Sequence, residues 1–230
     1  MNDFLEKTDW TRVRLPPAPP NIRGYMNKKK MLTTSKKNKV LIVSALEVET
    51  QGQLKDRRVL HTGVGKINAT LKLTKVLQES HLGFLPPLPD LVINYGTAGS
   101  RKIKKKTLVD CTKFIQRDMD VTGLGFLRGE TPFEKDVPAI IESTSEFNPI
   151  GRHATCGTGD NFVEDKSQYY GEVVDMEAYA FAKVCYLYDV PFISFKYISD
   201  GADGNSGTDW EQNVSDGFVE FREKILSLVK

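Results

Sequence analysis

Two acidic residues stand inside a run that is otherwise apolar. Asp175 and Glu177 interrupt the run VVDMEAYAFA (173–182), with Met176 between them. Charged side chains are seldom buried unless they are paired or used. A carboxyl group in such a position can accept hydrogen bonds from a ligand or transfer a proton. These acids therefore mark candidate positions for ligand binding or acid–base chemistry.

Polar or small residues also follow the apolar runs that resemble buried strands. The relevant stretches are SALEVET with Glu47 and Glu49, NYGTAGS, CGTGDNFV (156–163) and KYISDGAD. Ligands of α/β sheets bind at the carboxyl ends of strands. Each stretch alone fits a tight turn or a helix N-cap equally well. Their combination with the Asp-Met-Glu segment favours one ligand site.

The elements that would position these residues alternate between strand and helix. The pattern predicts strands over 40–46, 89–100, 107–116, 138–142, 151–158 and 191–198, and helices over 66–82, 175–188 and 210–229. In helix 66–82 the apolar spacing falls on Ile67, Leu71, Leu73 and Leu77. Such alternation predicts a single α/β domain over residues 38–230, with a mixed, mostly parallel central sheet flanked by helices in three layers.

Residues 1–37 differ from this pattern. They combine a proline-rich stretch with a basic cluster, and we expect a loosely ordered extension. A second interpretation places the natural start at Met31, and docking to an anionic partner is the least favoured.

The composition narrows the classes of function. A net charge of +2 argues against a nucleic-acid binder driven by a bulk positive field. No apolar run reaches membrane-spanning length, and the N-terminus carries no secretory signal. The three cysteines, Cys111, Cys156 and Cys185, lack disulfide or zinc spacing. We therefore expect a cytoplasmic protein with reduced thiols, no metal, no cofactor and no membrane or nucleic-acid partner.

Several motifs together resemble one enzyme family. In order they are SALEVE, TGVGKINA, NYGTAGS, RDMDVTGLGF, GTGDNFV, VVDMEAYAFAKVC and ISDGAD, and they span about residues 39–230. This order resembles the nucleoside phosphorylase/nucleosidase superfamily, most closely the 5′-methylthioadenosine/S-adenosylhomocysteine nucleosidases. The resemblance implies a phosphorylase/hydrolase-like fold and hydrolysis of an adenine nucleoside to adenine and free sugar, without a cofactor.

The resemblance also implies a role for each acid. Asp200 matches the catalytic acid that protonates the purine as the glycosidic bond breaks, and Ser199 would orient its carboxylate. Glu49, rather than Glu47, matches the glutamate that activates water. Glu177 matches the acceptor of the ribose hydroxyls, with Met176 packed against the ribose. The role of Asp175 stays open between the site and the first turn of a helix.

The remaining matched positions would line the substrate pocket. Phe162 and Val163 match the adenine subsite, and Thr97, Ala98 and Gly99 match a loop near the sugar. Leu46, Val64 and Trp210 match apolar positions around the 5′ substituent, although the family often has phenylalanine in place of Trp210. In a homodimer, Val121, Leu124, Phe126 and Pro132 would close the pocket of the partner.

Two departures leave the substrate open. Lys196 stands where typical members have arginine, and SRKIKKK (100–106) is unusually basic. An AMP-like substrate would need a cation near its 5′ phosphate, which Arg128 or the basic run could supply. A phosphorylase would need a cation beside the first strand, where Glu47 and Glu49 stand. A binding module without activity is the non-enzymatic alternative.

Overall fold

The computed structural model describes residues 39–229 of the chain. The predictions made for residues 1–37 lie outside this range. Eight strands share one sheet. They are β1 (Val40–Ser44), β2 (Arg58–His61), β3 (Leu91–Gly99), β4 (Leu108–Gln116), β5 (Ile140–Glu142), β6 (Ala154–Thr158), β7 (Val173–Asp175) and β8 (Phe192–Asp200).

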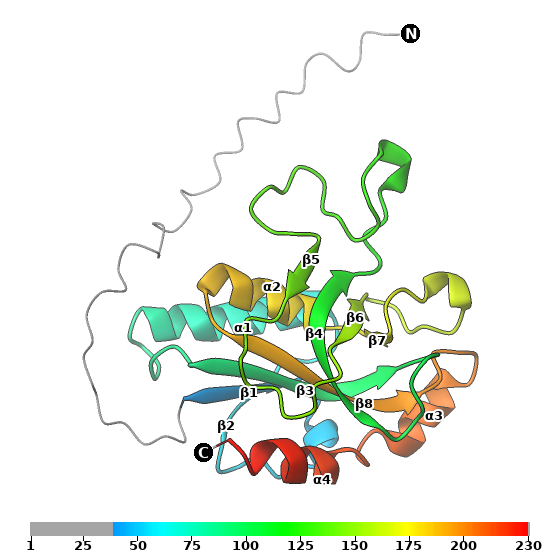
Figure 1. The fold of residues 1–230 in the computed structure, drawn as a ribbon. Coiled ribbons are helices and arrows are strands. Elements are labelled where there is room, and N and C mark those ends of the chain that lie inside the picture. The colour runs from blue at the N-terminus through cyan, green and yellow to red at the C-terminus, as the bar shows by residue number, and fades with distance from the viewer. Residues whose placement is uncertain (1–38, 230) are drawn as a thin grey trace. The chain divides into compact units, whose positions relative to one another are not determined.

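Five of these strands close into a ring. β3 pairs with β7, β7 with β6, β6 with β4, β4 with β8, and β8 returns to β3. β1 and β2 extend the sheet beyond β3, and β5 extends it beyond β4. Parallel pairs outnumber antiparallel ones, as the sequence predicts, but the sheet curls into a barrel-like arrangement (Figure 1).

Helices cover the sheet on both sides (Figure 1). They are α1 (Lys66–His81), α2 (Ala178–Tyr188), α3 (Ser206–Asn213) and α4 (Phe218–Phe221), which continues into a π-helical turn over Arg222–Leu226. Strand side chains alternate between the two faces, so that Leu41 and Val43 pack with α1 and α2 while Ile42 packs with α4. The predicted single α/β domain, with a mixed, mostly parallel sheet flanked by helices, is confirmed, and its central sheet differs from one flat layer because five strands close into a ring.

The strand register brings the carboxyl ends of distant strands together. Gly99 at the end of β3 pairs with both Val174 of β7 and Asp200 of β8. Thr158 at the end of β6 pairs with Asp175 and with Gln116 of β4. The residues that follow these strands therefore converge on one edge of the ring.

Some predicted boundaries are wrong. The segment from Asp175 does not begin a helix, because Asp175 still pairs with β6 and α2 starts at Ala178. The predicted helix 210–229 is broken, because a Ser-Asp-Gly turn at 215–217 separates α3 from α4. The short strands β2 and β7 were not predicted. Both consist of four residues or fewer and depend on partners distant in sequence.

The apolar stripe of α1 agrees with the prediction only at Leu73 and Leu77. Ala69, Leu73 and Leu77 are buried, whereas Ile67 and Leu71 are 79% and 67% exposed. Ile67 lies two residues from Ala69, which places it about 200° around the helix, away from the sheet. Ile67 and Leu71 thus form a second, solvent-facing apolar stripe.

None of the helices within residues 39–229 has the length and apolar character needed to cross a membrane.

Candidate active site

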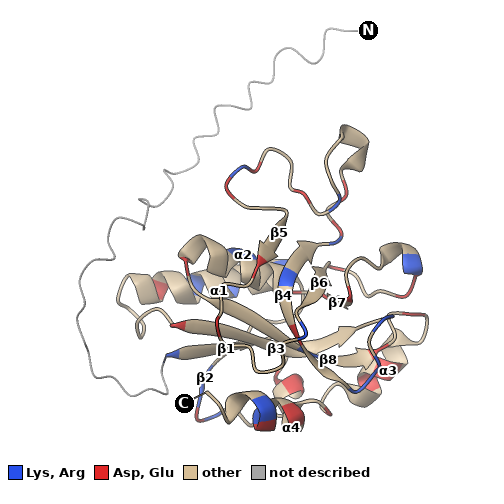
Figure 2. Cartoon of the chain, in the orientation of Figure 1, with Lys and Arg blue, Asp and Glu red and all other residues tan. Residues whose placement is uncertain are grey.

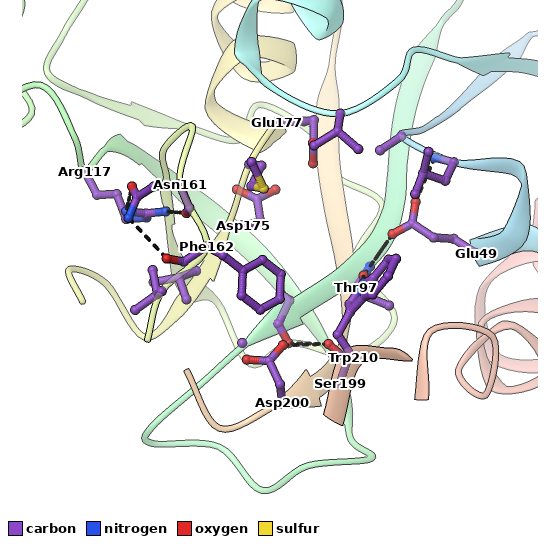
Figure 3. A pocket seen from close by; sticks show the side chains of 18 residues that line it. Glu49, Thr97, Arg117, Asn161, Phe162, Asp175, Glu177, Ser199, Asp200 and Trp210 are labelled. Carbon is purple, nitrogen blue, oxygen red and sulfur yellow. Dashed lines mark hydrogen bonds between the residues drawn. The ribbon is translucent and has the colours of Figure 1, made fainter. Parts of the chain in front are cut away.

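A cavity of about 220 Å³ lies where the strand ends converge. All thirteen residues predicted to be catalytic or substrate-binding line it (Figure 3). Five further residues complete the lining: Ala45, Arg117, Asn161, Val174 and Asp175. The four residues predicted to close a partner's pocket, Val121, Leu124, Phe126 and Pro132, do not line the cavity of their own chain.

Glu49 is held at the cavity by four hydrogen-bond donors. It lies in a 3₁₀ turn over Glu47–Thr50 and is only 4% exposed. Its Oε2 accepts from Ser44 Oγ at 2.8 Å and from the backbone N–H of Leu46 at 3.1 Å. Its Oε1 accepts from the backbone N–H of Thr97 at 2.9 Å and from Thr97 Oγ1 at 3.0 Å. Glu47, in the same turn, is exposed to solvent and does not line the cavity.

Asp200 is fixed at the end of β8 on the opposite side. Ser199 Oγ donates to Asp200 Oδ2 at 2.8 Å, and the backbone N–H of Ala202 donates to Oδ1 at 2.9 Å. The neighbouring residue of β3 is Gly99, where a Cβ would lie 2.4 Å from Asp200 Oδ1 and would displace the carboxylate. The carboxylate therefore has a defined orientation before any ligand arrives.

Asp175 forms a buried ion pair below the cavity. Its Oδ2 lies 2.7 Å from Lys196 Nζ and accepts the backbone N–H of Ala178 at 2.9 Å, and its Oδ1 accepts from Thr158 Oγ1 at 2.5 Å. Burial alone would raise the pKa of Asp175, but the ammonium group of Lys196 holds it below its ordinary value. Asp175 thus both pairs with a buried cation and caps the first turn of α2.

Glu177 is buried beside this pair and faces the cavity (Figure 3). Its Oε1 accepts the backbone N–H of Gly65, just before α1, at 2.8 Å. Burial, followed by the negative charge of Asp175, raises the pKa of Glu177 to about 8. Glu177 therefore holds a proton at neutral pH and can both donate and accept hydrogen bonds.

The loop after β6 carries Phe162 and Val163 and is clamped by Arg117. The guanidinium of Arg117 donates to Asn161 Oδ1 at 2.8 Å and to the carbonyl oxygen of Gly159 at 3.3 Å. Phe162 is 41% exposed at the mouth of the cavity, whereas Val163 is buried. The position of the aromatic ring thus depends on a cation that is itself almost fully buried.

The sequence of the described domain matches a known family. Residues 40–230 match the profile of the phosphorylase superfamily. The chain belongs to the phosphorylase superfamily. Its relatives include proteins named 5′-methylthioadenosine/S-adenosylhomocysteine nucleosidase. That of Haemophilus influenzae (strain PittEE) is 32% identical, over 74% of this chain and 80% of the relative. That of Actinobacillus succinogenes is 30% identical, over 86% and 90%. The resemblance and the assignment to the N-glycosidase enzymes are confirmed.

Solved structures of the superfamily have the same fold. A Helicobacter pylori nucleosidase mutant with 5′-methylthioadenosine in its active site aligns with a TM-score of 0.70 at 21% identity, over 84% of this chain and 98% of the other. A futalosine hydrolase mutant from the same organism aligns with a TM-score of 0.69 at 20% identity, over 83% and 99%. At these identities the comparison establishes the fold alone.

The sequence analysis did not identify two polar residues that line the cavity, Arg117 and Asn161. Arg117 follows β4 directly, so the rule that strand ends carry ligand residues applies to it as well. Asn161 lies within the stretch CGTGDNFV, but nothing in that stretch indicates that its side chain would accept from Arg117.

The raised pKa of Glu177 implies that the free energy of unfolding depends on pH, which can be tested. The folded chain keeps the proton of Glu177 up to about pH 8, whereas an ordinary glutamate releases it near 4.5. The free energy of unfolding contributed by this group is therefore fully present below about pH 4.5 and is lost as the pH rises to about 8.

We expect Glu177→Gln, which mimics the protonated carboxyl, to remove this loss. The Tm of the variant minus that of the wild type should increase steadily between pH 5 and pH 8.5, measured by differential scanning calorimetry. A difference that stayed constant or fell over that range would contradict the raised pKa.

Proposed function

We propose that this chain hydrolyses the N-glycosidic bond of an adenine nucleoside of the 5′-methylthioadenosine/S-adenosylhomocysteine type, releasing adenine and the free sugar. The observation that carries the proposal is the arrangement of Glu49, Glu177 and Asp200, which approach one cavity from three sides (Figure 3). The relatives at 30% identity or more that are named nucleosidases support the substrate class.

Asp200 acts at the purine base of the substrate. With its orientation set by Ser199 and Ala202, its carboxyl group delivers a proton to a purine ring nitrogen as the bond to the sugar breaks. Phe162, at the cavity mouth, offers an aromatic face on which the purine stacks. The departing base leaves as a neutral molecule, which lowers the barrier to cleavage.

Glu177 and Met176 act at the ribose. A carboxyl group can engage both hydroxyls of a ribose at once, which supplies orientation as well as affinity. Glu177 is held by the N–H of Gly65 and is largely protonated at neutral pH, so it offers one donor and several acceptor sites. Met176, which also lines the cavity, supplies apolar contact to the sugar.

Glu49 acts on the water molecule. Cleavage develops positive charge on the sugar, so the incoming water needs accurate placement and modest activation. The four donors that hold Glu49 fix the orientation of the carboxylate at the side of the cavity near Thr97 and Trp210 (Figure 3). The proton released by the attacking water passes to this carboxylate.

The cavity disfavours an AMP-like substrate. Among the described residues that line it, Arg117 is the sole lysine or arginine, and it is engaged with Asn161 and Gly159 across the cavity from Trp210. Arg128 lies in the loop 120–132, but its guanidinium is engaged within its own chain, where it donates to the carbonyl oxygen of Arg117 at 3.0 Å and lies over the Tyr170 ring, 4.9 Å from the centroid.

The basic run 100–106 does not supply the missing cation either, because none of its lysines and arginines lines the cavity. Lys105 and Lys106 pair with Asp209 and Asp216 at 2.8 and 3.2 Å, so their charges are partly neutralised by the C-terminal part of the chain (Figure 2). An apolar 5′ substituent fits Leu46, Val64 and Trp210 better than a phosphate does.

The reaction itself should require no phosphate. Purified protein incubated with 5′-methylthioadenosine, S-adenosylhomocysteine, adenosine, inosine and AMP should release adenine from the first two at the highest rates, with free sugar as the second product. Addition of phosphate should leave these rates unchanged, because the first strand leads to Glu49 rather than to a cation. Activity that appeared only with phosphate, with a sugar 1-phosphate as product, would replace hydrolysis by phosphorolysis.

Substitutions should separate the three acids by their kinetics. Asp200→Asn should lower kcat by about a hundredfold or more, since it removes the transferable proton. Glu49→Gln should abolish turnover with little change in substrate affinity, whereas Glu177→Ala, which removes both the donor and the acceptors of the carboxyl group, should raise KM and lower kcat together. Glu47→Gln is the matched control for Glu49, because Glu47 is exposed in the same turn. If Glu47→Gln lost turnover while Glu49→Gln kept it, the assignment after β1 would be wrong.

We also propose that the enzyme is a homodimer in which residues 120–132 of each chain close the partner's cavity. Leu124 and Leu127 on this loop are 75% and 73% exposed, and Phe133, directly after it, is 86% exposed. The loop begins next to α1, because Asp118 binds the ammonium group of Lys66, and α1 adds the exposed apolar stripe of Ile67 and Leu71. Exposed apolar side chains in such number mark an interaction surface.

A charge placed on this surface should break the dimer. We expect Leu124→Asp to sediment as a monomer and to have a raised KM, because the partner no longer completes the pocket. Leu228→Asp, at a leucine 58% exposed in the C-terminal segment, should stay dimeric. A fully active wild-type monomer in sedimentation at assay concentration would contradict the proposal.

A further inference from the structure

Trp210 makes a polar contact that an apolar wall would not need. It lies on α3, and its indole Nε1 donates to Thr97 Oγ1 at 3.0 Å (Figure 3). Thr97 Oγ1 in turn lies 3.0 Å from Glu49 Oε1. The three groups therefore form a chain of two hydrogen bonds that ends on the carboxylate.

The direction of these two hydrogen bonds follows from which groups can donate and which can accept. An indole N–H can only donate, and an ionised carboxylate can only accept. The Thr97 hydroxyl has a single hydrogen and must accept from Trp210, so its hydrogen points to Glu49. The indole thus determines the orientation of one of the four donors that hold Glu49.

The position of Trp210 is itself anchored. Asn213, on the same helix, donates Nδ2–H to the carbonyl oxygen of Ser199 at 3.0 Å, next to Asp200. The carboxylate of Asp209, also on α3, forms an ion pair with the ammonium group of Lys105 at 2.8 Å. Helix α3 is therefore fixed to the end of β8, and its indole reaches Thr97 from a rigid support.

We propose that Trp210 is a positioning residue for Glu49, acting through the Thr97 hydroxyl, in addition to lining the cavity. The inference rests on the proposed function, in which Glu49 activates water. Phenylalanine at this position would lack the N–H and could not direct the hydroxyl. Without the indole donor, the Thr97 hydroxyl is free to rotate away from Glu49, and the carboxylate is held less well for its task.

The test is a double-mutant cycle on Trp210→Phe and Thr97→Val. Trp210→Phe keeps an aromatic ring at the cavity and should lower kcat for 5′-methylthioadenosine by about two- to tenfold, the range expected for one hydrogen bond. KM should change less than about twofold, because the contact acts on Glu49 and not on bound substrate. In a Thr97→Val background, Trp210→Phe should cause no further loss of kcat. In a Thr97→Ser background, which keeps the hydroxyl, the loss should persist.

Control measurements distinguish this effect on kcat from a general loss of folded structure. On the surface, the hydroxyl of Tyr188 donates a hydrogen bond of similar length, 2.8 Å, to Gln78 Oε1. Tyr188→Phe removes this bond and should leave kcat unchanged. Thermal melting checks that each variant is folded. A loss that appeared in KM alone, or that was equally large in the Thr97→Val background, would overturn the proposal and leave Trp210 as an apolar wall.

A spectroscopic measurement covers the case in which Trp210→Phe does not fold. The sequence has two tryptophans, so in Trp10→Phe the fluorescence reports Trp210 alone. Adding Thr97→Val should shift its emission to shorter wavelength, because the indole loses its acceptor. An unchanged emission would overturn the proposal. Failure of the wild-type enzyme to release adenine without phosphate would instead contradict the proposed function, so the two failures are distinguishable.

Discussion

Lys196 and Asp175 form an ion pair 2.7 Å apart whose side chains are 2% and 1% exposed. Removing two charges from water costs several kcal/mol per ion, and such a pair is tolerated only when further hydrogen bonds complete it. Thr158 and the N–H of Ala178 supply them on the side of Asp175. The pair joins β7 to β8, so the end of the ring that surrounds the cavity depends on it. It also keeps Asp175 ionised, and that charge is one reason that the neighbouring Glu177 remains protonated.

The acids of the site need backbone that comes very close to them. A Cβ on Gly96 would lie 3.2 Å from Glu49 Oε1 and 3.3 Å from Lys196 Nζ, and one on Gly99 would lie 2.4 Å from Asp200 Oδ1. The small residues of NYGTAGS therefore make room for the carboxylates of Glu49 and Asp200, which lie at two sides of the cavity. Any side chain at Gly99 would have to displace Asp200 or the strand that carries it.

The two loops at the cavity are joined by the first turn of α1. The N–H of Gly65 binds Glu177, and the N–H of Lys66 donates to Asp160 Oδ1 at 2.7 Å, in the loop that carries Phe162. Helix termini leave backbone donors that need partners from elsewhere. Here those partners come from the segments that would hold ribose and base, so the start of α1 sets the spacing between the two subsites. Lys66 adds an ion pair to Asp118 at the start of the loop proposed to reach the partner chain.

The sequence alone was sufficient for the α/β fold and most of its long strands, because buried strands and periodic helices carry local signals, and the resemblance of its ordered motifs indicated the family. It was also sufficient to gather thirteen residues that the structure places around one cavity, since a motif fixes its own register even where single residues are ambiguous. The structure alone identified the partner of Asp175, because Lys196 lies 21 residues away and reaches it only after β7 and β8 have both paired with β3. The structure alone also revealed β2 and β7, which are defined by their pairing with other strands, and the hydrogen bonds by which Arg117 holds the loop after β6. Likewise, the indole of Trp210 meets Thr97 across 113 residues. Such contacts depend on which chain segments the folded backbone brings together, and residue types and local spacing do not specify that.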